Sequence, residues 1–229
     1  MKSANSPRNL SKKTARYLVG IDEVGRGPIA GPVAVGAFIF LTPDAVKFFK
    51  GVKESKQLTE EKREAWFVKI LEAQKKGLID YCVTFQSEKV IDTKGLPYAI
   101  KKCLETSLQE VTTLARDTIK NSEQTLVLLD GGLKAPPHFI HQKTIIKGDV
   151  KEAVIALASI CAKVLRDRKM KILAKKYPHY GFEIHKGYGT KAHYKAITTH
   201  GLSPLHRKSF CRKITSMLEP SMRPLAKKT

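Results

Sequence analysis

The chain has 229 residues, of which 42% are hydrophobic, and its 42 Lys and Arg against 21 Asp and Glu give a formal net charge of +21 at pH 7. This apolar content excludes a wholly disordered chain, and the length suits one well-packed domain with at most a small addition. The basic excess predicts a polyanionic partner, for which nucleic acid is the first candidate.

The hydrophobic pattern predicts an ordered series of strands and helices behind a basic start. Residues 1–16 are rich in Lys and Arg and contain no acid, which indicates a basic, disordered arm. The elements that follow are strand, strand, helix, strand, helix, strand, strand and helix. Their expected bounds are 17–23, 31–40, 59–76, 78–86, 96–120, 125–129, 143–147 and 150–177. We therefore expect a main domain over 17–178 and a C-terminal extension of short helices and loops over 179–229.

The spacing of these elements indicates an α/β fold. The first two strands are joined too closely for a crossover helix, so they should pair antiparallel. The wholly apolar strand at 125–129 is typical of a sheet that is covered on both faces. A mixed central β-sheet flanked by helices is the architecture that fits both features.

The four cysteines and the absence of long apolar runs bear on the cellular compartment. No run approaches roughly 18 apolar residues, and the N-terminus lacks a hydrophobic signal core, so we expect a soluble, cytoplasmic protein without a membrane partner. The cysteines are scattered beside hydrophobic runs, which predicts buried free thiols rather than disulfides or zinc ligands. They are Cys82, Cys103, Cys161 and Cys211.

Acidic residues next to glycine recur where predicted strands end. They are the pair Asp22-Glu23, Asp130 and Asp149. Acids at strand ends are where open α/β sheets place their chemistry, and carboxylate oxygens are the ligands that Mg²⁺ prefers. Four acids are enough to hold two ions, and a metal pair can stabilise both the attacking and the leaving oxygen of a phosphodiester. The pattern therefore predicts a metal-dependent site.

Each acid also has an explanation that needs no metal. Asp149 suits the N-cap of the helix expected from residue 150, and Asp130 before two glycines suits a turn. Asp22 and Glu23 point to opposite faces if both are extended, which leaves one of them to act through its backbone carbonyl or a water. The recurrence of the pattern in so basic a chain favours the site.

One segment of the sequence resembles a known family. Residues 20–33, GIDEVGRGPIAGPV, resemble the signature of bacterial type II ribonuclease H (ribonuclease HII). The resemblance continues in the family's order through ESKQL at 54–58, LLDG at 128–131, KGD at 147–149, ASICAKV at 158–164, HKGYGT at 185–190 and HRKSF at 206–210. It implies a ribonuclease H-like fold.

The resemblance also implies an activity. It implies an endoribonuclease that hydrolyses the RNA strand of RNA–DNA hybrids and incises 5′ of single ribonucleotides in duplex DNA, leaving 3′-hydroxyl and 5′-phosphate ends. The four acids would bind Mg²⁺ or Mn²⁺ and act by a two-metal mechanism. The expected partners are RNA–DNA hybrids and DNA duplexes that contain ribonucleotides, and the chain is expected to be a monomer. A hybrid-sensing binding module and a DNA-junction nuclease on a similar fold are the alternatives.

Further residues receive substrate-binding roles from the resemblance. Gly25, Arg26 and Gly27 match the loop that senses the 2′-hydroxyl group, which is the feature that separates RNA from DNA. Tyr188 matches a tyrosine that stacks on the sugar after the ribonucleotide. The remaining expected contacts to the nucleic acid are Lys56, Lys186 and Arg207. From the residues alone, Tyr188 would equally suit a half-buried aromatic, and Arg26 a brace for its own loop.

Overall fold

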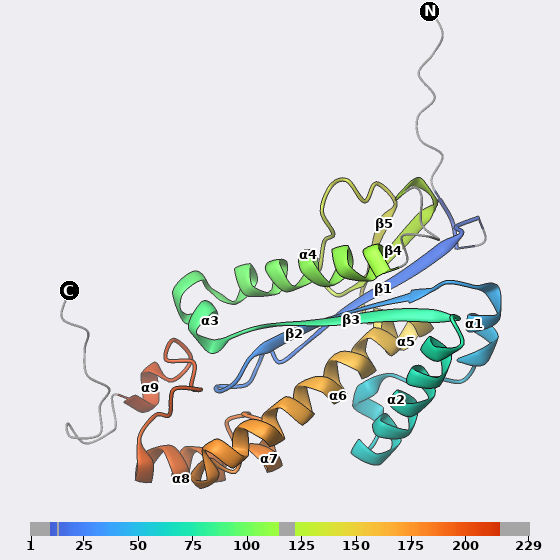
Figure 1. Cartoon of the computed structure of the whole chain (residues 1–229). Helices are drawn as coiled ribbons and strands as arrows, with labels where there is room; N and C mark the ends of the chain where they lie inside the picture. Colours follow the sequence, from blue (N-terminus) through green and yellow to red (C-terminus); the bar gives the residue numbers. More distant parts are fainter. Residues whose placement is uncertain (1–9, 13, 115–121, 216–229) are drawn as a thin grey trace, which may run out of the picture.

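The computed structural model of the chain describes residues 10–12, 14–114 and 122–215, and it has a mixed five-stranded sheet with helices on both faces (Figure 1). The strands are β1 (Tyr17–Val24), β2 (Val33–Phe40), β3 (Ile79–Gln86), β4 (Thr125–Asp130) and β5 (Gln142–Ile145). The longer helices are α2 (Glu60–Lys75), α4 (Leu96–Leu114), α6 (Ala153–Lys176) and α8 (Lys191–His200). The short helices are α1 (Pro43–Phe48), α3 (Glu88–Lys94), α5 (Gly148–Lys151), α7 (Phe182–His185) and α9 (Arg212–Thr215), with 3₁₀ turns η1 (Ser55–Gln57), η2 (Ser122–Gln124) and η3 (Pro178–Tyr180).

The sheet has the mixed topology that the sequence predicts. Its strand order is β3-β2-β1-β4-β5, and the closely joined β1 and β2 pair antiparallel, as do β2 and β3. β1 pairs parallel with β4, and β4 pairs parallel with β5. The parallel pair β1 and β4 therefore lies at the centre of the sheet, with its carboxyl ends at one edge.

Each face of the sheet carries its own hydrophobic cluster. On one face, Val19 and Ile21 of β1 pack with α4. On the other face, Leu126 and Leu128 of β4 pack with residues of α1, α2 and α6. Figure 1 shows α3 and α4 on one side of the sheet and α2, α5 and α6 on the other. The apolar strand β4 is thus covered on both sides, as its composition predicts.

Two glycines let α6 lie directly against the sheet. A Cβ added at Gly20 on β1 would lie 2.3 Å from the carbonyl oxygen of Val154, and one at Gly36 on β2 would lie 2.4 Å from that of Ala158. Both positions therefore exclude any side chain. This close approach brings the N-terminal turns of α6 next to the carboxyl end of β1, where the acids lie.

The C-terminal extension has a small hydrophobic cluster of its own. Phe182, Ile197 and Leu205 pack there against Met170 near the end of α6 and against Ala30 from the loop before β2. In Figure 1 the red and orange helices α7 and α8 lie beside the far end of α6. The extension is therefore attached to the glycine-rich loop after β1 as well as to α6.

The structure differs from the sequence predictions in three places. Helix α3, which Ser87 caps by accepting the N–H of Val90, was not anticipated. Part of the predicted arm, residues 10–12 and 14–16, lies on the domain, because Leu10 packs on the cluster around α6 and Lys12 pairs with Glu152 at 2.7 Å. Residues 1–9 and 13 of that arm, residues 115–120 of the predicted helix and the tail after 215 lie outside the described residues.

The third difference concerns the last predicted helix. It begins as the separate turn α5 and is interrupted at Glu152, whose extended backbone (φ −128°, ψ 114°) precedes α6.

Three of the four cysteines are buried, as the sequence predicts, and Cys82 is half-buried. All four cysteines are free thiols, and burial raises the pKa of Cys103 and Cys211 to about 11. None of the helices within the described ranges combines the length and apolar character that crossing a membrane requires.

Candidate functional site

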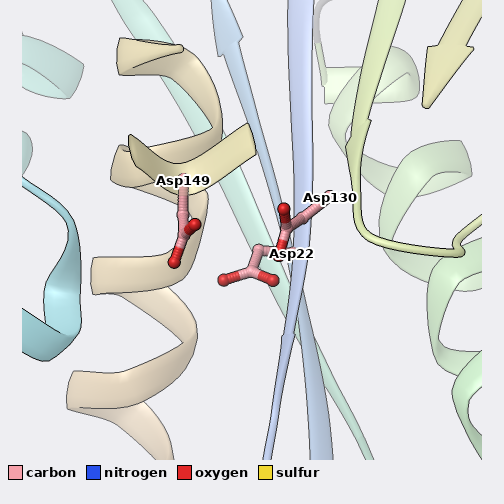
Figure 2. A group of neighbouring side chains, drawn as sticks. All are labelled: Asp22, Asp130 and Asp149. Atoms are coloured by element: carbon pink, nitrogen blue, oxygen red, sulfur yellow. The ribbon is translucent and has the colours of Figure 1, made fainter. Parts of the chain in front are cut away.

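Three aspartates converge at the carboxyl end of β1. Carboxylate oxygens of Asp22, Asp130 and Asp149 all lie within 4.8 Å of one another. Figure 2 shows that they come from three elements, since Asp22 lies on β1, Asp130 on the neighbouring strand and Asp149 on the turn of α5. The exposed fractions of Asp22 and Asp149 are only 4% and 3%. Three of the four acids that the sequence indicated therefore form one cluster, in which Asp22 and Asp149 are buried and Asp130 is half-buried.

The register of the sheet brings Asp22 and Asp130 together. In the parallel pairing of β1 and β4, Ile21 lies opposite Leu129, so the next residues along the two strands are Asp22 and Asp130. Ile21 and Leu129 point toward α4. Because successive side chains alternate, both carboxylates point to the opposite face, toward α6.

Asp149 reaches the cluster through the turn that joins β5 to α5. Lys147 adopts a left-handed backbone (φ 55°), after which the N–H of Gly148 donates to Oδ1 of Asp130 at 2.6 Å. A Cβ at Gly148 would lie 2.7 Å from Cδ1 of Ile155, so a larger residue here would require that side chain to move. The prediction that Asp149 caps the long helix is wrong, because the break at Glu152 places Asp149 inside the separate turn α5.

Glu23 lies next to this cluster but does not belong to it. Its Oε1 accepts from Nη1 of Arg26 at 2.9 Å, and its side chain is 13% exposed. Its Oε2 is buried and has no hydrogen-bond partner among the described residues. Strand alternation accounts for this placement, because it directs Glu23 and Asp22 to opposite faces of the sheet.

A cleft of about 230 Å³ opens beside the aspartates, and eight of the eleven residues predicted for the site line it. The lining includes Asp22, Glu23, Gly25, Arg26, Gly27, Ser55, Lys56, Asp130, Ser159, Lys163 and Tyr188. Nζ of Lys56 lies 3.5 Å from Oδ2 of Asp149 while its side chain remains 78% exposed. The glycine-arginine-glycine loop, Lys56 and Tyr188 therefore share one cleft with the acids.

The electrostatics of the cleft suit a cation. Burial, with repulsion from Glu23 and Asp130, raises the pKa of Asp22 to about 7, although a hydrogen bond with Ser159 lowers it. Burial also raises the pKa of Glu23, against the opposing effect of Arg26. Crowded, buried carboxylates and an unpartnered carboxylate oxygen are compensated by a hard divalent cation. The donor set, which is made of carboxylate oxygens, fits Mg²⁺ or Mn²⁺.

Arg207 occupies a different place from the one predicted. Its side chain is fully buried and donates to the carbonyl oxygens of Gly31 (2.9 Å), Arg26 (3.1 Å) and Gly25 (2.7 Å). It therefore cannot contact a nucleic acid directly, because the protein itself uses all three of its nitrogens. Its role is to hold the backbone of the loop that follows β1.

Lys186 is also largely buried, which contradicts its expected contact with substrate. Its Nζ donates to the carbonyl oxygen of Glu183 at 2.5 Å and lies 3.5 Å from Oε2 of Glu60. The residue has a left-handed backbone (φ 52°) and leads into Gly187, whose carbonyl oxygen accepts the N–H groups of Ile29 and Ala30. Lys186 therefore shapes the loop that presents Tyr188.

Tyr188 stands at the edge of the cleft, and buried histidines hold its backbone. Its side chain is exposed, and a Cβ at Gly27 would lie 3.6 Å from its ring. The N–H of Ser203 donates to Nδ1 of His206 at 2.9 Å, so His206 carries its proton on Nε2 and donates to Nε2 of His193 at 3.0 Å. His193 then donates from Nδ1 to the carbonyl oxygen of Tyr188 at 2.8 Å. These partners assign the tautomers of both neutral rings.

Two residues of α6 belong to this region although the sequence did not single them out. Ser159 lines the cleft and shares a hydrogen bond of 2.7 Å with Ser55. Arg166 is buried and donates to the carbonyl oxygens of Pro32 and Lys186. A serine within the otherwise apolar run 154–162 was the available signal for Ser159, which also lies in the segment 158–164 that carries part of the family resemblance. Arg166 follows that segment, but its residue type alone does not separate it from the other basic residues of α6.

Comparison with known proteins places this geometry in a family context. The family model described as Ribonuclease HII matches residues 19–213. The chain is 41% identical over 206 residues to Ribonuclease HII of Endomicrobium trichonymphae, with 89% of each chain covered. It is 42% identical over 205 residues to that of Caldicellulosiruptor bescii, with 88% of this chain and 90% of the relative covered. The crystal structure of ribonuclease H2 from Pyrococcus horikoshii OT3 matches with a TM-score of 0.64 at 25% identity, over 88% of this chain and 98% of that one.

Proposed function

This chain belongs to the ribonuclease HII family and is a ribonuclease H endonuclease, and we propose that it both hydrolyses the RNA strand of RNA–DNA hybrids and cuts on the 5′ side of single ribonucleotides in duplex DNA. The observation that carries the proposal is the cleft beside the three aspartates. It joins a candidate metal site to a loop and an aromatic ring that can examine a sugar. A phosphodiester and the ribose attached to it can then be recognised together.

Asp22, Asp130 and Asp149 are the residues that would hold the divalent cations. Glu23 would complete the set once its carboxylate exchanged Arg26 for a cation. Bound Mg²⁺ or Mn²⁺ ions would activate water and stabilise the charge of the leaving oxygen, which is the chemistry of two-metal phosphodiester hydrolysis. The chain contributes the orientation of these carboxylates. The N–H of Gly148 fixes Asp130, and the N–H of Glu23 donates to Oδ1 of Asp22 at 2.8 Å.

The loop of Gly25, Arg26 and Gly27 is the proposed sensor of the 2′-hydroxyl group. Gly25 has a left-handed backbone (φ 94°), and a Cβ there would lie 2.4 Å from Nε of Arg166, so the position requires glycine. The missing side chain at Gly27 leaves backbone accessible beside Tyr188. A 2′-hydroxyl group both donates and accepts hydrogen bonds, and rigid backbone groups can read it without sequence preference.

Tyr188 and Lys56 are the proposed contacts to the rest of the nucleic acid. The ring of Tyr188 is 44% exposed at the mouth of the cleft, where it can stack on a sugar. Nζ of Lys56 lies between Asp149 and solvent, where it can pair with a backbone phosphate. The formal charge of +21 favours the approach of any duplex, whatever its sequence.

A panel of matched duplexes tests the proposed reaction. Purified protein is incubated with an RNA–DNA hybrid, an RNA duplex and a DNA duplex of one sequence, in Mg²⁺, in Mn²⁺ and in EDTA. We expect cleavage of the RNA strand of the hybrid alone, with 3′-hydroxyl and 5′-phosphate ends, and none in EDTA. Cleavage that survives EDTA, or an intact hybrid in both metals, would contradict the proposal.

A further inference from the structure

The side chain of Arg26 lies between the acid cleft and a second cavity. It lines the cleft beside Asp22 and also a cavity of about 510 Å³ between α4 and residues 132–137. The side chain is 59% exposed, and the hydrogen bond and ion pair of its guanidinium both go to Oε1 of Glu23. Arg26 therefore has open space on both sides of its present position, whereas its backbone is held in place by Arg207.

The two carboxylate oxygens of Glu23 differ in their partners. Oε1 is neutralised by Arg26, while the buried Oε2 has no partner in the described part of the chain. Asp130 lies near enough to raise the pKa of Glu23 further. A carboxylate with a buried, unpartnered oxygen beside a second carboxylate gains from a divalent cation, and its charge would then no longer need the guanidinium.

We propose that Arg26 and a divalent cation exchange at Glu23. Arg26 neutralises Glu23 through Oε1, and a cation at the aspartates would compete with Arg26 for the same carboxylate. When a cation binds at the aspartates, Glu23 turns its charge toward that cation and releases Arg26. This inference rests on the proposed function, because it assigns the order of events at the same metal site.

The released guanidinium has a use in the proposed reaction. A planar guanidinium binds a phosphate through two parallel hydrogen bonds, and Arg26 belongs to the loop that would face the ribonucleotide. Metal binding would therefore free the side chain that holds the substrate. Substrate would in turn favour metal by the same factor, because linkage between two binding sites is reciprocal.

Mn²⁺ binding to the free protein tests the exchange without any substrate. The dissociation constant is measured for the wild type, Arg26→Gln, Glu23→Gln and the double variant. We expect Arg26→Gln to tighten binding about fivefold, the factor that corresponds to the loss of a competing ion pair of about 1 kcal/mol. In the Glu23→Gln background, the same Arg26→Gln change should alter the constant by less than about twofold.

Arg168→Gln is the matched control, because it removes the same charge from an ion pair, here with Glu64 on α2. Arg168 lies nine residues after Ser159 on α6, which is about 13 Å along the helix axis from the cleft. It should leave Mn²⁺ binding within about twofold of the wild type. Equal tightening by Arg26→Gln in both backgrounds, or no tightening in either, would overturn the exchange alone. A wild-type chain that binds no Mn²⁺ would overturn the metal site of the proposed function and the exchange with it.

Discussion

The acid cleft and the C-terminal extension are held together by different interactions. In the cleft, strand register and a tight turn bring Asp22, Asp130 and Asp149 together, although their charges repel. In the extension, buried Arg207 bonds to backbone groups far away in the chain, and buried His193 bonds to the carbonyl oxygen of Tyr188, five residues earlier. The difference fits the proposed function, in which the acids would serve chemistry at some cost in stability and the polar groups of the extension would place the loops that read the substrate.

Removing an acid should separate activity from stability most strongly. Asp22→Asn and Asp130→Asn remove charge from the proposed metal site but keep the size and the acceptor oxygen. We expect cleavage of a hybrid to fall at least about 10³-fold. The free energy of unfolding should stay the same or rise, because a buried repulsive charge is lost. Single-turnover rates and urea unfolding on each variant measure the two quantities. Normal turnover in both variants would contradict the metal assignment.

Replacing Arg207, in contrast to replacing an acid, should lower the free energy of unfolding. Arg207→Met leaves three buried carbonyl oxygens of the loop without their donor, so we expect the free energy of unfolding to fall by about 3 kcal/mol. Arg168→Met removes a partly exposed ion pair on α6 and should cost less than about 1 kcal/mol. Urea unfolding of the two variants provides the comparison. Equal, small losses would show that the extension does not depend on its buried guanidinium.

The histidine pair should make the extension sensitive to acid. Burial lowers the pKa of His193 and of His206 to about 4, so the folded protein resists protonation that the unfolded chain accepts near pH 6.5. The stability they contribute is complete above pH 6.5 and is lost as the pH falls toward 4. At pH 5 the loss is about 2 kcal/mol for each histidine.

The raised pKa of Asp22 changes stability with pH in the opposite direction, so the experiment must remove the contribution of Asp22. Its pKa in the folded protein, about 7, lies above the unfolded value of 3.8, so the stability linked to Asp22 grows as the pH falls. The unfolding free energy is therefore measured between pH 7 and 5 in Asp22→Asn, with and without His193→Gln. We expect the free energy of unfolding to decline as the pH falls in Asp22→Asn, and to decline less steeply when His193→Gln is added. Parallel curves would contradict the role of the histidines.

The smallest effect concerns Tyr188. Tyr188→Ala should lower cleavage of a duplex with a single ribonucleotide about tenfold, because a stacking contact of roughly 1–3 kcal/mol is lost. Binding to a plain DNA duplex should change less than twofold. Tyr98 on α4 is similarly exposed, at 42% against 44%, and Tyr98→Ala is the matched control. If cleavage of the ribonucleotide duplex and binding to the plain DNA duplex fell by the same factor, Tyr188 would have a packing role instead.

The sequence was sufficient for the part of the molecule that local patterns control. Short apolar runs predicted β1 and its neighbours, and the alternation of side chains along an extended strand predicted that Asp22 and Glu23 would point apart. Asp22 and Asp130 stand where two of these apolar runs end, and the observed register of β1 and β4 sets them side by side. For this reason the three aspartates could be found before the structure was known.

The remaining features depend on contacts that no local pattern records. Arg207 reaches carbonyl oxygens that lie 176 to 182 residues earlier in the chain, so the sequence alone left it among the exposed basic residues. The break at Glu152 carries neither glycine nor proline, and Asp149 was therefore placed at a helix N-cap instead of inside α5. Contacts between distant parts of the chain therefore decided the position of Arg207.

The most direct test of the central claim is cleavage of a DNA duplex that carries one ribonucleotide. Wild type and Asp130→Asn are compared on this duplex and on an all-DNA duplex of the same sequence, with Mn²⁺ and with EDTA. We predict one cut by the wild type, on the 5′ side of the ribonucleotide, that needs the metal, and no cut by Asp130→Asn. An intact ribonucleotide duplex, or equal cutting of the all-DNA duplex, would contradict the claim that this cleft recognises a ribonucleotide and hydrolyses the bond before it.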